Sequence, residues 1–283
     1  MKSIRKPAWA GRFYPGAPGE LRTMVDGLLA AAPLQDEGRR LLGLVVPHAG
    51  YIYSGATAAA GYRLAAARTI DTVVVVAPSH GAYIRGVALY PGEAFATPLG
   101  EIEIDRELTR ALAAAAPEQL HLSEEGHATD GGRPEHSLEV QLPFLQCACK
   151  TPFKLVAALF HDYSWEVCRA LGDALAAVHH ERMLIAASSD LYHGESYAAC
   201  LRADARTLDL LQQGDGEAFC RAYEREEAQA CGAGPIAALL HAGARIGATA
   251  VRLLARTNSE EATGEPSGYV VGYAAAAVEW PQA

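Results

Sequence analysis

Three of the ten histidines, His48, His80 and His193, lie a few residues after three different apolar runs, and each has a glycine or a proline beside it. An aspartate, Asp190, stands three residues before the last of them. Imidazole binds zinc, copper and iron, and its pKa near neutrality suits it to moving protons. Two imidazoles with a third protein ligand and an open coordination position would form a catalytic metal site. The histidine pattern therefore predicts a functional site.

The thiol best placed to be the third ligand is Cys231. It lies just before Gly234-Pro235, which is typical of a helix with proline at its first position. A helix N-terminus favours the thiolate, which is the form that binds metals or attacks carbon. The other cysteines lie in or near apolar stretches, and we expect them to be buried thiols of a protein in a reducing compartment. They are Cys147, Cys149, Cys168, Cys200 and Cys220.

A further polar cluster lies between Arg133 and Gln141. Its pattern predicts a helix with Ser137 as N-cap and Glu139 in the first turn. Two interpretations stay open for His136 and Glu139. Either they orient ligands or substrate from beside the site, or they belong to ordinary helix capping with a solvent-exposed imidazole.

The aromatic pairs Phe13-Tyr14 and Tyr51-Tyr53 could form the wall of a pocket, and we place Tyr51 beside the site or its substrate. Core packing is the commoner fate of such side chains. The other histidines have no motif around them, and we expect them at the surface. They are His121, His127, His161, His179, His180 and His241.

Short apolar runs alternate with helical patterns along most of the chain. The runs at 42–46, 72–77, 155–159 and 183–187 predict strands that are buried on both faces. Helical spacing predicts helices at 20–31, 56–66, 106–115, 165–178, 197–212 and 235–246. This alternation favours a mostly parallel sheet with helices on both faces. Ligands bind beyond the carboxyl ends of such strands, which is where the three histidines fall.

The rest of the chain is less regular. Runs at 248–255 and 269–278 predict two late strands joined by a polar loop at 258–268, and 92–132 predicts an excursion around one helix. Neither a repeat nor a linker interrupts the sequence, so we expect a single domain over residues 1–283. The glycine-rich motifs that hold nucleotides after a strand are absent, so the sequence predicts no nucleotide cofactor.

The charge balance limits the partners. The 283 residues include 24 basic and 33 acidic side chains, a formal net charge of -9, which disfavours binding to nucleic acid. No apolar run approaches the roughly 20 residues of a membrane helix, and the N-terminus lacks the pattern of a secretory signal. We therefore expect a cytoplasmic protein whose partner is a small molecule or a peptide, rather than nucleic acid or a membrane.

The order of the motifs resembles the Memo family, whose bacterial members are labelled AmmeMemoRadiSam system protein B. The motifs lie at 9–15, 46–55, 77–80, 135–144, 188–193 and 231–232. The family in turn resembles the class III extradiol dioxygenases of the LigB type, which are non-haem iron enzymes, in fold and in site location. The resemblance implies a three-layer α/β/α sandwich around a mostly parallel mixed sheet. It also implies a functional link to a radical SAM protein.

The resemblance also implies residue roles. His48 and His80 match the two histidines of the family's metal position, and Cys231 stands where the dioxygenases have a carboxylate ligand. Asp190 and His193 match the family's Asp-x-x-His motif, with His193 similar to the acid/base histidine of the dioxygenases. The metal implied is Fe(II), with copper or zinc as alternatives because thiolate is a softer ligand than carboxylate.

Three functional hypotheses follow. The first is a metal-dependent oxidoreductase of unknown substrate, in which His48, His80 and Cys231 bind the ion. In it His193 is the general base, and Asp190 fixes the tautomer of His193 or completes the ligand shell. The second is a non-catalytic module that binds a peptide or another partner in an ancestral pocket. The third is a metal-free hydrolase or transferase with Cys231 as nucleophile and His193 or His48 as its base.

Overall fold

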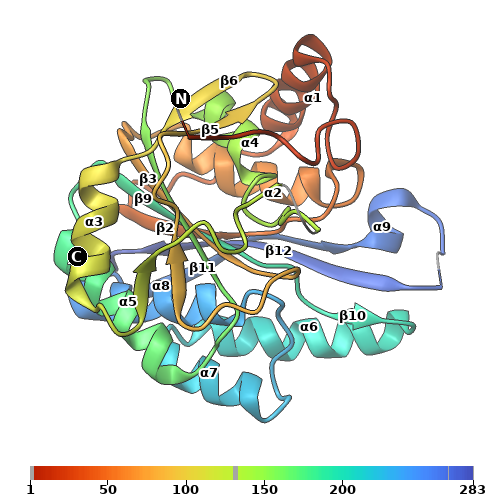
Figure 1. Ribbon diagram of the computed structural model, residues 1–283. Coiled ribbons are helices and arrows are strands. Elements are labelled where there is room, and N and C mark those ends of the chain that lie inside the picture. Colours follow the sequence, from red (N-terminus) through yellow and green to blue (C-terminus); the bar gives the residue numbers. More distant parts are fainter. Residues whose placement is uncertain (1–2, 130–132, 267, 283) are drawn as a thin grey trace.

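The computed structural model describes residues 3–129, 133–266 and 268–282. The strands, labelled in Figure 1, are β1 (Ile4–Arg5), β2 (Leu41–Val46), β3 (Thr72–Pro78), β4 (Val87–Leu89), β5 (Ala94–Thr97), β6 (Gly100–Glu103), β7 (Leu120–Leu122), β8 (Lys154–Phe160), β9 (Met183–Ser188), β10 (His193–Gly194), β11 (Ala250–Asn258) and β12 (Val270–Glu279). The helices are α1 (Pro18–Ala31), α2 (Tyr51–Ala65), α3 (Arg106–Ala115), α4 (Gln141–Ala148), α5 (Trp165–Val178), α6 (Tyr197–Gln212), α7 (Gly216–Glu224), α8 (Ala233–Ile246) and α9 (Ser259–Thr263).

The larger sheet is mixed, with a parallel centre. Its strand order is β10-β12-β2-β9-β3-β8-β4-β7, and β11 pairs with β12. The four central strands β2, β9, β3 and β8 are parallel to one another. β12 is antiparallel to β2, and β4 is antiparallel to β8. The predicted mostly parallel mixed sheet is confirmed.

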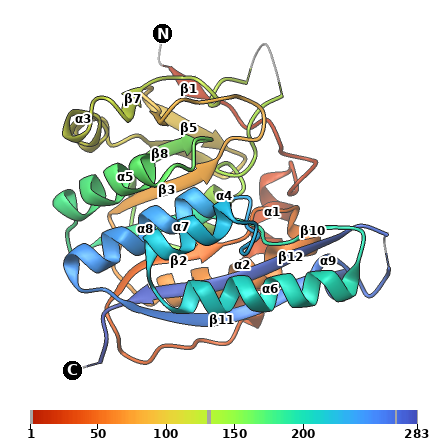
Figure 2. The same ribbon diagram turned by 90° about the horizontal axis from the view of Figure 1, so that it is seen from below.

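Helices cover both faces of this sheet. α1, α2 and α4 lie on one face, and α5, α6, α7 and α8 lie on the other (Figures 1 and 2). Alternate residues of the central strands enter opposite layers: Val73 and Val75 pack with the first group of helices, whereas Val74 and Val76 pack with the second. This double burial explains the unbroken apolar runs and confirms the three-layer α/β/α architecture. Within the described residues, no helix is both long and apolar enough to cross a membrane.

Two irregular segments contain more structure than the sequence predicted. Within 92–132, β5 and β6 pair with β1 as a separate three-stranded sheet, and β7 joins the edge of the larger sheet beside β4. The loop predicted at 258–268 contains α9, whose N-cap Asn258 accepts a hydrogen bond from the backbone of Glu261. Elements of three to five residues show too little periodicity to be recognised in a sequence. Residues 130–132 and 267 of these segments lie outside the described residues.

α8 lies very close to the centre of the sheet at Gly43 of β2. A Cβ at this position would lie 2.5 Å from the carbonyl oxygen of Ile185 and 2.7 Å from Cδ1 of Leu239. Both distances are far below van der Waals contact. The absence of a side chain at Gly43 therefore sets how closely β2, β9 and α8 approach.

We predict that Gly43→Ala lowers the free energy of unfolding by about 2 kcal/mol or more, because overpacking a tight core forces backbone and rotamer shifts. Gly27→Ala is the matched control, since a Cβ at Gly27, inside α1, meets nothing within 4 Å. The control should instead stabilise the protein by about 0.5 to 1 kcal/mol, the difference in helix propensity between the two residues. Urea unfolding measures both values, and equal effects would contradict this account of the packing.

Candidate metal centre

The candidate site lies where three adjacent parallel strands end. His48, Asp190 and His80 each lie two residues beyond the end of β2, β9 and β3, which are neighbours in the sheet. Cys231 approaches from the loop before α8, and its backbone N–H donates to the Asp190 carbonyl oxygen at 3.1 Å. A Cβ at the next residue, Gly232, would lie 2.1 Å from the last carbonyl oxygen of β9. Glycine is therefore required for this close approach of the loop to the strand.

Three donor atoms converge at this edge. One ring nitrogen each of His48 and His80 and Sγ of Cys231 all lie within 4.8 Å of one another, and Nε2 of His48 is 3.1 Å from the sulfur. Metal–nitrogen and metal–sulfur bonds of roughly 2.0 to 2.3 Å place the ligands of one ion at comparable separations. Two imidazoles and a thiol form a donor set that fits zinc, copper or iron. His80, Glu135 and His136 form a second such group.

A hydrogen-bond network assigns the tautomer of His48. The hydroxyl of Ser188 donates to the carbonyl oxygen of Ser137 at 2.7 Å and accepts from the side-chain amide of Gln141 at 2.8 Å. The Ser188 proton is thus already used, so Nδ1–H of His48 must donate to Oγ of Ser188, at 2.8 Å. Nε2 of His48 then carries the free lone pair and faces Cys231. Sequence analysis missed Ser188 and Gln141, because nothing in their local motifs indicates that they meet.

Glu135 holds the ring of His80 through Nδ1, as Ser188 holds the ring of His48. Its Oε1 lies 3.0 Å from Nδ1 of His80, and its Oε2 accepts the backbone N–H of that residue. Oε1 also accepts the backbone N–H groups of His136 and Ser137, at 2.8 and 2.9 Å. Burial alone would raise the pKa of Glu135, but the hydrogen bond and charge of His80, together with the charge of His136, lower it to about 2. A carboxylate that orients a ligand histidine is common around metal ions. Sequence analysis missed it, although Glu135 adjoins His136 in the polar cluster.

His136 is buried beside the site rather than exposed. It is 9% exposed, and its ring stacks on that of His80 with centroids 4.8 Å apart. Burial lowers its pKa to about 4, so its imidazole is neutral near pH 7. Ser137 is not a helix cap, contrary to the sequence prediction: its hydroxyl donates to the Pro78 carbonyl oxygen, and α4 begins only at Gln141. The turns before α4 are held instead by the Glu135 carboxylate.

Glu139 points toward the N-terminal segment. Its carboxylate accepts from the Arg5 guanidinium at 2.6 Å, from the backbone N–H of Trp9 at 2.8 Å and from the Tyr14 hydroxyl at 2.6 Å. Tyr51 is buried in the core, and its hydroxyl donates to the carbonyl oxygen of Val140 at 2.6 Å. These contacts hold the N-terminal segment and the start of α2 against the turns that carry His136.

Asp190 and His193 occupy different environments. Oδ1 of Asp190 accepts the backbone N–H of His48 at 2.7 Å, and Oδ2 lies 3.9 Å from Nε2 of that residue. Burial raises the pKa of Asp190 to about 7, although the hydrogen bond from the His48 backbone opposes the shift. His193 is exposed on β10, and its Nδ1–H donates to the Leu191 carbonyl oxygen at 3.0 Å. That carbonyl orients the His193 ring and leaves its Nε2 lone pair free.

The thiol of Cys231 is neutral in the absence of a cation. Burial first, and then the negative charge of Asp190, raise the pKa of Cys231 well above its ordinary value. Burial and the neighbouring histidines lower the pKa of His48 well below its ordinary value. In the metal-free state, burial and the charge of Asp190 therefore oppose the thiolate that was expected at this helix start. A bound cation would reverse this balance, since a coordinating thiol is deprotonated.

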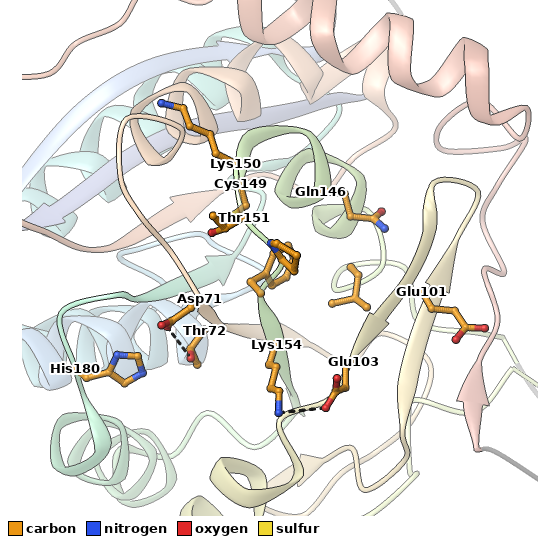
Figure 3. A pocket seen from close by; sticks show the side chains of 13 residues that line it. Asp71, Thr72, Glu101, Glu103, Gln146, Cys149, Lys150, Thr151, Lys154 and His180 are labelled. Atoms are coloured by element: carbon orange, nitrogen blue, oxygen red, sulfur yellow. Dashed lines mark hydrogen bonds and ion pairs between the residues drawn. The ribbon is translucent and has the colours of Figure 1, made fainter.

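Other predicted features fall elsewhere. His127 was expected at the surface but is 1% exposed, and its Nε2–H bonds to the Ala88 carbonyl oxygen at 3.0 Å. A cavity of about 810 Å³ lies at the opposite edge of the sheet, where β3 and β8 begin (Figure 3). In this cavity Lys154 and Glu103 form an ion pair 3.2 Å long, so their charges neutralise each other. Neither of the two donor groups found in the described part of the chain lies in this cavity.

Comparison with known proteins gives full-length matches. The family described as "Memo-like protein" matches residues 5–277. A "MEMO1 family protein" of Nitrosopumilus maritimus is 32% identical, over 96% of this chain and 98% of that protein. Proteins with the same description from Aeropyrum pernix and Methanosarcina acetivorans are 35% and 36% identical, over 97% and 98% of this chain and 99% of each of those proteins.

We predict that Cys231 of the metal-free protein alkylates slowly at pH 7.5. Each unit by which its pKa is raised lowers the thiolate fraction about tenfold, and the thiolate is the nucleophile. The rate constant with iodoacetamide, followed by peptide mass spectrometry with Cys231→Ser as the assignment control, should be at least about tenfold below that of free cysteine. This rate constant should still increase with pH above pH 9. Fast alkylation at pH 7 that disappears in His193→Ala would contradict this prediction and favour a thiol hydrolase.

Proposed function

This chain belongs to the Memo family, and on that premise we propose that it binds one transition-metal ion through His48, His80 and Cys231. The observation that carries the proposal is the convergence of their three donor atoms within 4.8 Å. The hydrogen bond from Nδ1 of each imidazole further supports it. His48 is committed to Ser188 and His80 to Glu135, so each ring has Nε2 available as a ligand atom.

The proposed ion is Fe(II), with copper or zinc as alternatives. Two neutral imidazoles and one thiolate form a borderline to soft donor set, which suits all three metals better than magnesium or calcium. When bound, the ion would supply Lewis-acid or redox chemistry to a small molecule at its open positions. The activity we propose is that of a metal-dependent oxidoreductase of unknown substrate, acting in the cytoplasm and functionally linked to a radical SAM protein.

The surrounding residues have separate roles in this proposal. His193, with Nε2 unengaged by the Leu191 hydrogen bond, accepts a proton from the substrate as general base. Asp190 fixes the backbone of His48, and its carboxyl group, with a pKa of about 7, exchanges a proton near neutrality. The buried rings of His136 and Trp9 cover one side of the centre, with centroids 5.5 Å apart.

The two other hypotheses are separated by metal content and thiol reactivity. A thiol hydrolase needs a thiolate–imidazolium pair, but the pKa values of Cys231 and His48 are shifted in the directions that keep both groups neutral. This observation counts against Cys231 as a nucleophile. A non-catalytic binding module would hold neither a metal ion nor a reactive thiol.

We predict one ion per chain after anaerobic reconstitution with Fe(II) and desalting, measured by elemental analysis. His48→Ala and Cys231→Ala should each lose the ion, because each removes a ligand. Glu135→Gln should weaken binding about 10- to 100-fold, as is typical when the group that orients a metal-bound histidine is changed. His180→Ala, an exposed histidine at the opposite edge, is the matched control and should bind normally. Equal metal content in all four variants would refute the proposed ligand set.

We also predict that metal affinity rises with pH. Below the raised pKa of Cys231, binding of the ion must release one proton from the thiol, whereas His48 is already neutral. One proton released per ion increases the apparent affinity about tenfold for each pH unit. Titration with Co(II) between pH 7.5 and 9 should give this slope, and Cys231→Ser should flatten it. A flat profile in the unmodified protein would mean that the thiol is not a ligand.

A further inference from the structure

Two arginines lie beside one indole ring near the candidate metal centre. The Cζ atoms of Arg12 and Arg133 are 5.6 and 5.8 Å from the ring centroid of Trp9. Both arginines are exposed, whereas Trp9 is 8% exposed. Within the residues that the structure describes, neither guanidinium forms an ion pair with a carboxylate. The pair is thus a local concentration of positive charge in a chain whose net charge is -9.

Ring contacts connect this charge to the metal ligands. Trp9 lies 5.5 Å from His136, and His136 stacks on His80 at 4.8 Å, both measured between ring centroids. Phe13 lies 4.7 Å from both Trp9 and His136. The backbone of Arg133 also borders the ligand loop, because a Cβ at Gly81 would lie 2.6 Å from its carbonyl oxygen. These contacts place Trp9 and its two arginines on the side of the candidate centre that His136 covers.

Two carboxylates of the described residues that follow Arg133 are already engaged. Glu135 accepts four N–H groups, including both from His80, and Glu139 is paired with Arg5 at 2.6 Å. Neither is available to neutralise Arg12 or Arg133. The ring that both arginines contact is also fixed, because Nε1–H of Trp9 donates to the Pro134 carbonyl oxygen at 3.0 Å. Weak, solvated cation–π contacts are the ordinary explanation of one guanidinium on a ring. Here two guanidinium groups share one ring, and neither has a carboxylate partner among the described residues.

We propose that Arg12 and Arg133 form a subsite for the oxyanion, a carboxylate or a phosphate, of a ligand whose other end reaches the ion at His48, His80 and Cys231. Guanidinium groups recognise both oxyanions through paired, charge-assisted hydrogen bonds. Trp9 and Phe13 both contact His136 on this side of the centre, and a ligand body that packs against these rings would be planar and apolar. This inference rests on the proposed function and names the class of ligand: a planar organic anion with a metal-binding group at the far end. Positive charge at the edge of an acidic protein also steers anions toward the centre.

The test uses matched metal-binding probes. Benzohydroxamate chelates the metal without a second charge, and 4-carboxybenzohydroxamate and 4-phosphonobenzohydroxamate add one of the two oxyanions. Binding to the Co(II)-loaded protein is followed through the visible absorption of cobalt. We expect at least one charged probe to bind about tenfold more tightly than benzohydroxamate, which corresponds to about 1.4 kcal/mol. The charged probe that binds more tightly shows whether the subsite takes a carboxylate or a phosphate. If neither charged probe binds more tightly than benzohydroxamate, the subsite is overturned.

Variants then assign the preference to the two arginines. In Arg12→Gln/Arg133→Gln the preference should fall to less than about twofold while binding of benzohydroxamate is unchanged, a difference of about 1 kcal/mol between the two proteins. Arg12→Lys/Arg133→Lys keeps the charges and should retain part of the preference, which guards against a folding defect. Arg110→Gln, an exposed arginine on α3, is the matched control and should behave as the unmodified protein. A preference that survives in the glutamine variant overturns the assignment.

A metal-free arm separates this inference from the proposed function. Phenylphosphonate and benzoate are titrated into the metal-free protein, and tryptophan fluorescence reports binding beside Trp9. Quenching that disappears in Arg12→Gln/Arg133→Gln supports the subsite even if the protein fails to bind cobalt, in which case only the proposed metal function fails. Equal quenching in both proteins, or none in either, overturns the subsite whatever the metal result.

Discussion

Three strands, β2, β9 and β3, run parallel in register, and the candidate centre inherits its geometry from that pairing. Val46 is opposite Ser188, and Val76 is opposite Ala187, so the three strands end at nearly the same level. One further residue then separates the end of each strand from His48, Asp190 or His80. A shift of register by one residue would turn every side chain to the other face of the sheet, and both faces are packed with apolar residues. The burial that stabilises the sheet therefore also fixes the relative positions of residues more than a hundred positions apart in the sequence.

Long, regular elements could be predicted from the sequence. The edge of the sheet that carries the site residues, at the carboxyl ends of the parallel strands, could be predicted too. α3, α5 and α6 have the predicted bounds, because each shows several turns of helical periodicity. The short strands β5, β6 and β7 could not be predicted, since three or four residues give no reliable period. Nor could the partners of the histidines, because the hydroxyl of Ser188 and the carboxylate of Glu135 reach them only through the fold. The resemblance to the Memo family supplied the ligand set, while the pKa of Cys231 depended on a degree of burial that the motif around it does not reveal.

The polar groups of the site fall into two kinds, paired carboxylates and neutral ligand groups. Backbone N–H groups and side chains saturate Glu135 and Glu139, so these buried carboxylates are fully paired, which is the condition for keeping a charge inside a protein. The imidazoles of His48 and His136 are held neutral by burial, and so their lone pairs remain usable. Charge is thus concentrated in the Glu135 and Glu139 carboxylates that support the site, whereas His48, His136 and the thiol of Cys231 are neutral. Of His48 and Cys231, only the thiol would have to lose a proton to bind a cation.

The ion pair between Arg5 and Glu139 joins residues 134 positions apart. On the ribosome, the N-terminal segment emerges first and must wait until almost half of the chain has been synthesised before its partner exists. The segment that carries Trp9 and Phe13 therefore cannot dock on the turns before α4 until Glu139 has emerged, and β8 and β9, which complete the centre of the sheet, are synthesised later still. Contacts of such long sequence separation slow folding, and the site is complete only when the later segments that carry Asp190 and Cys231 have joined the N-terminal half.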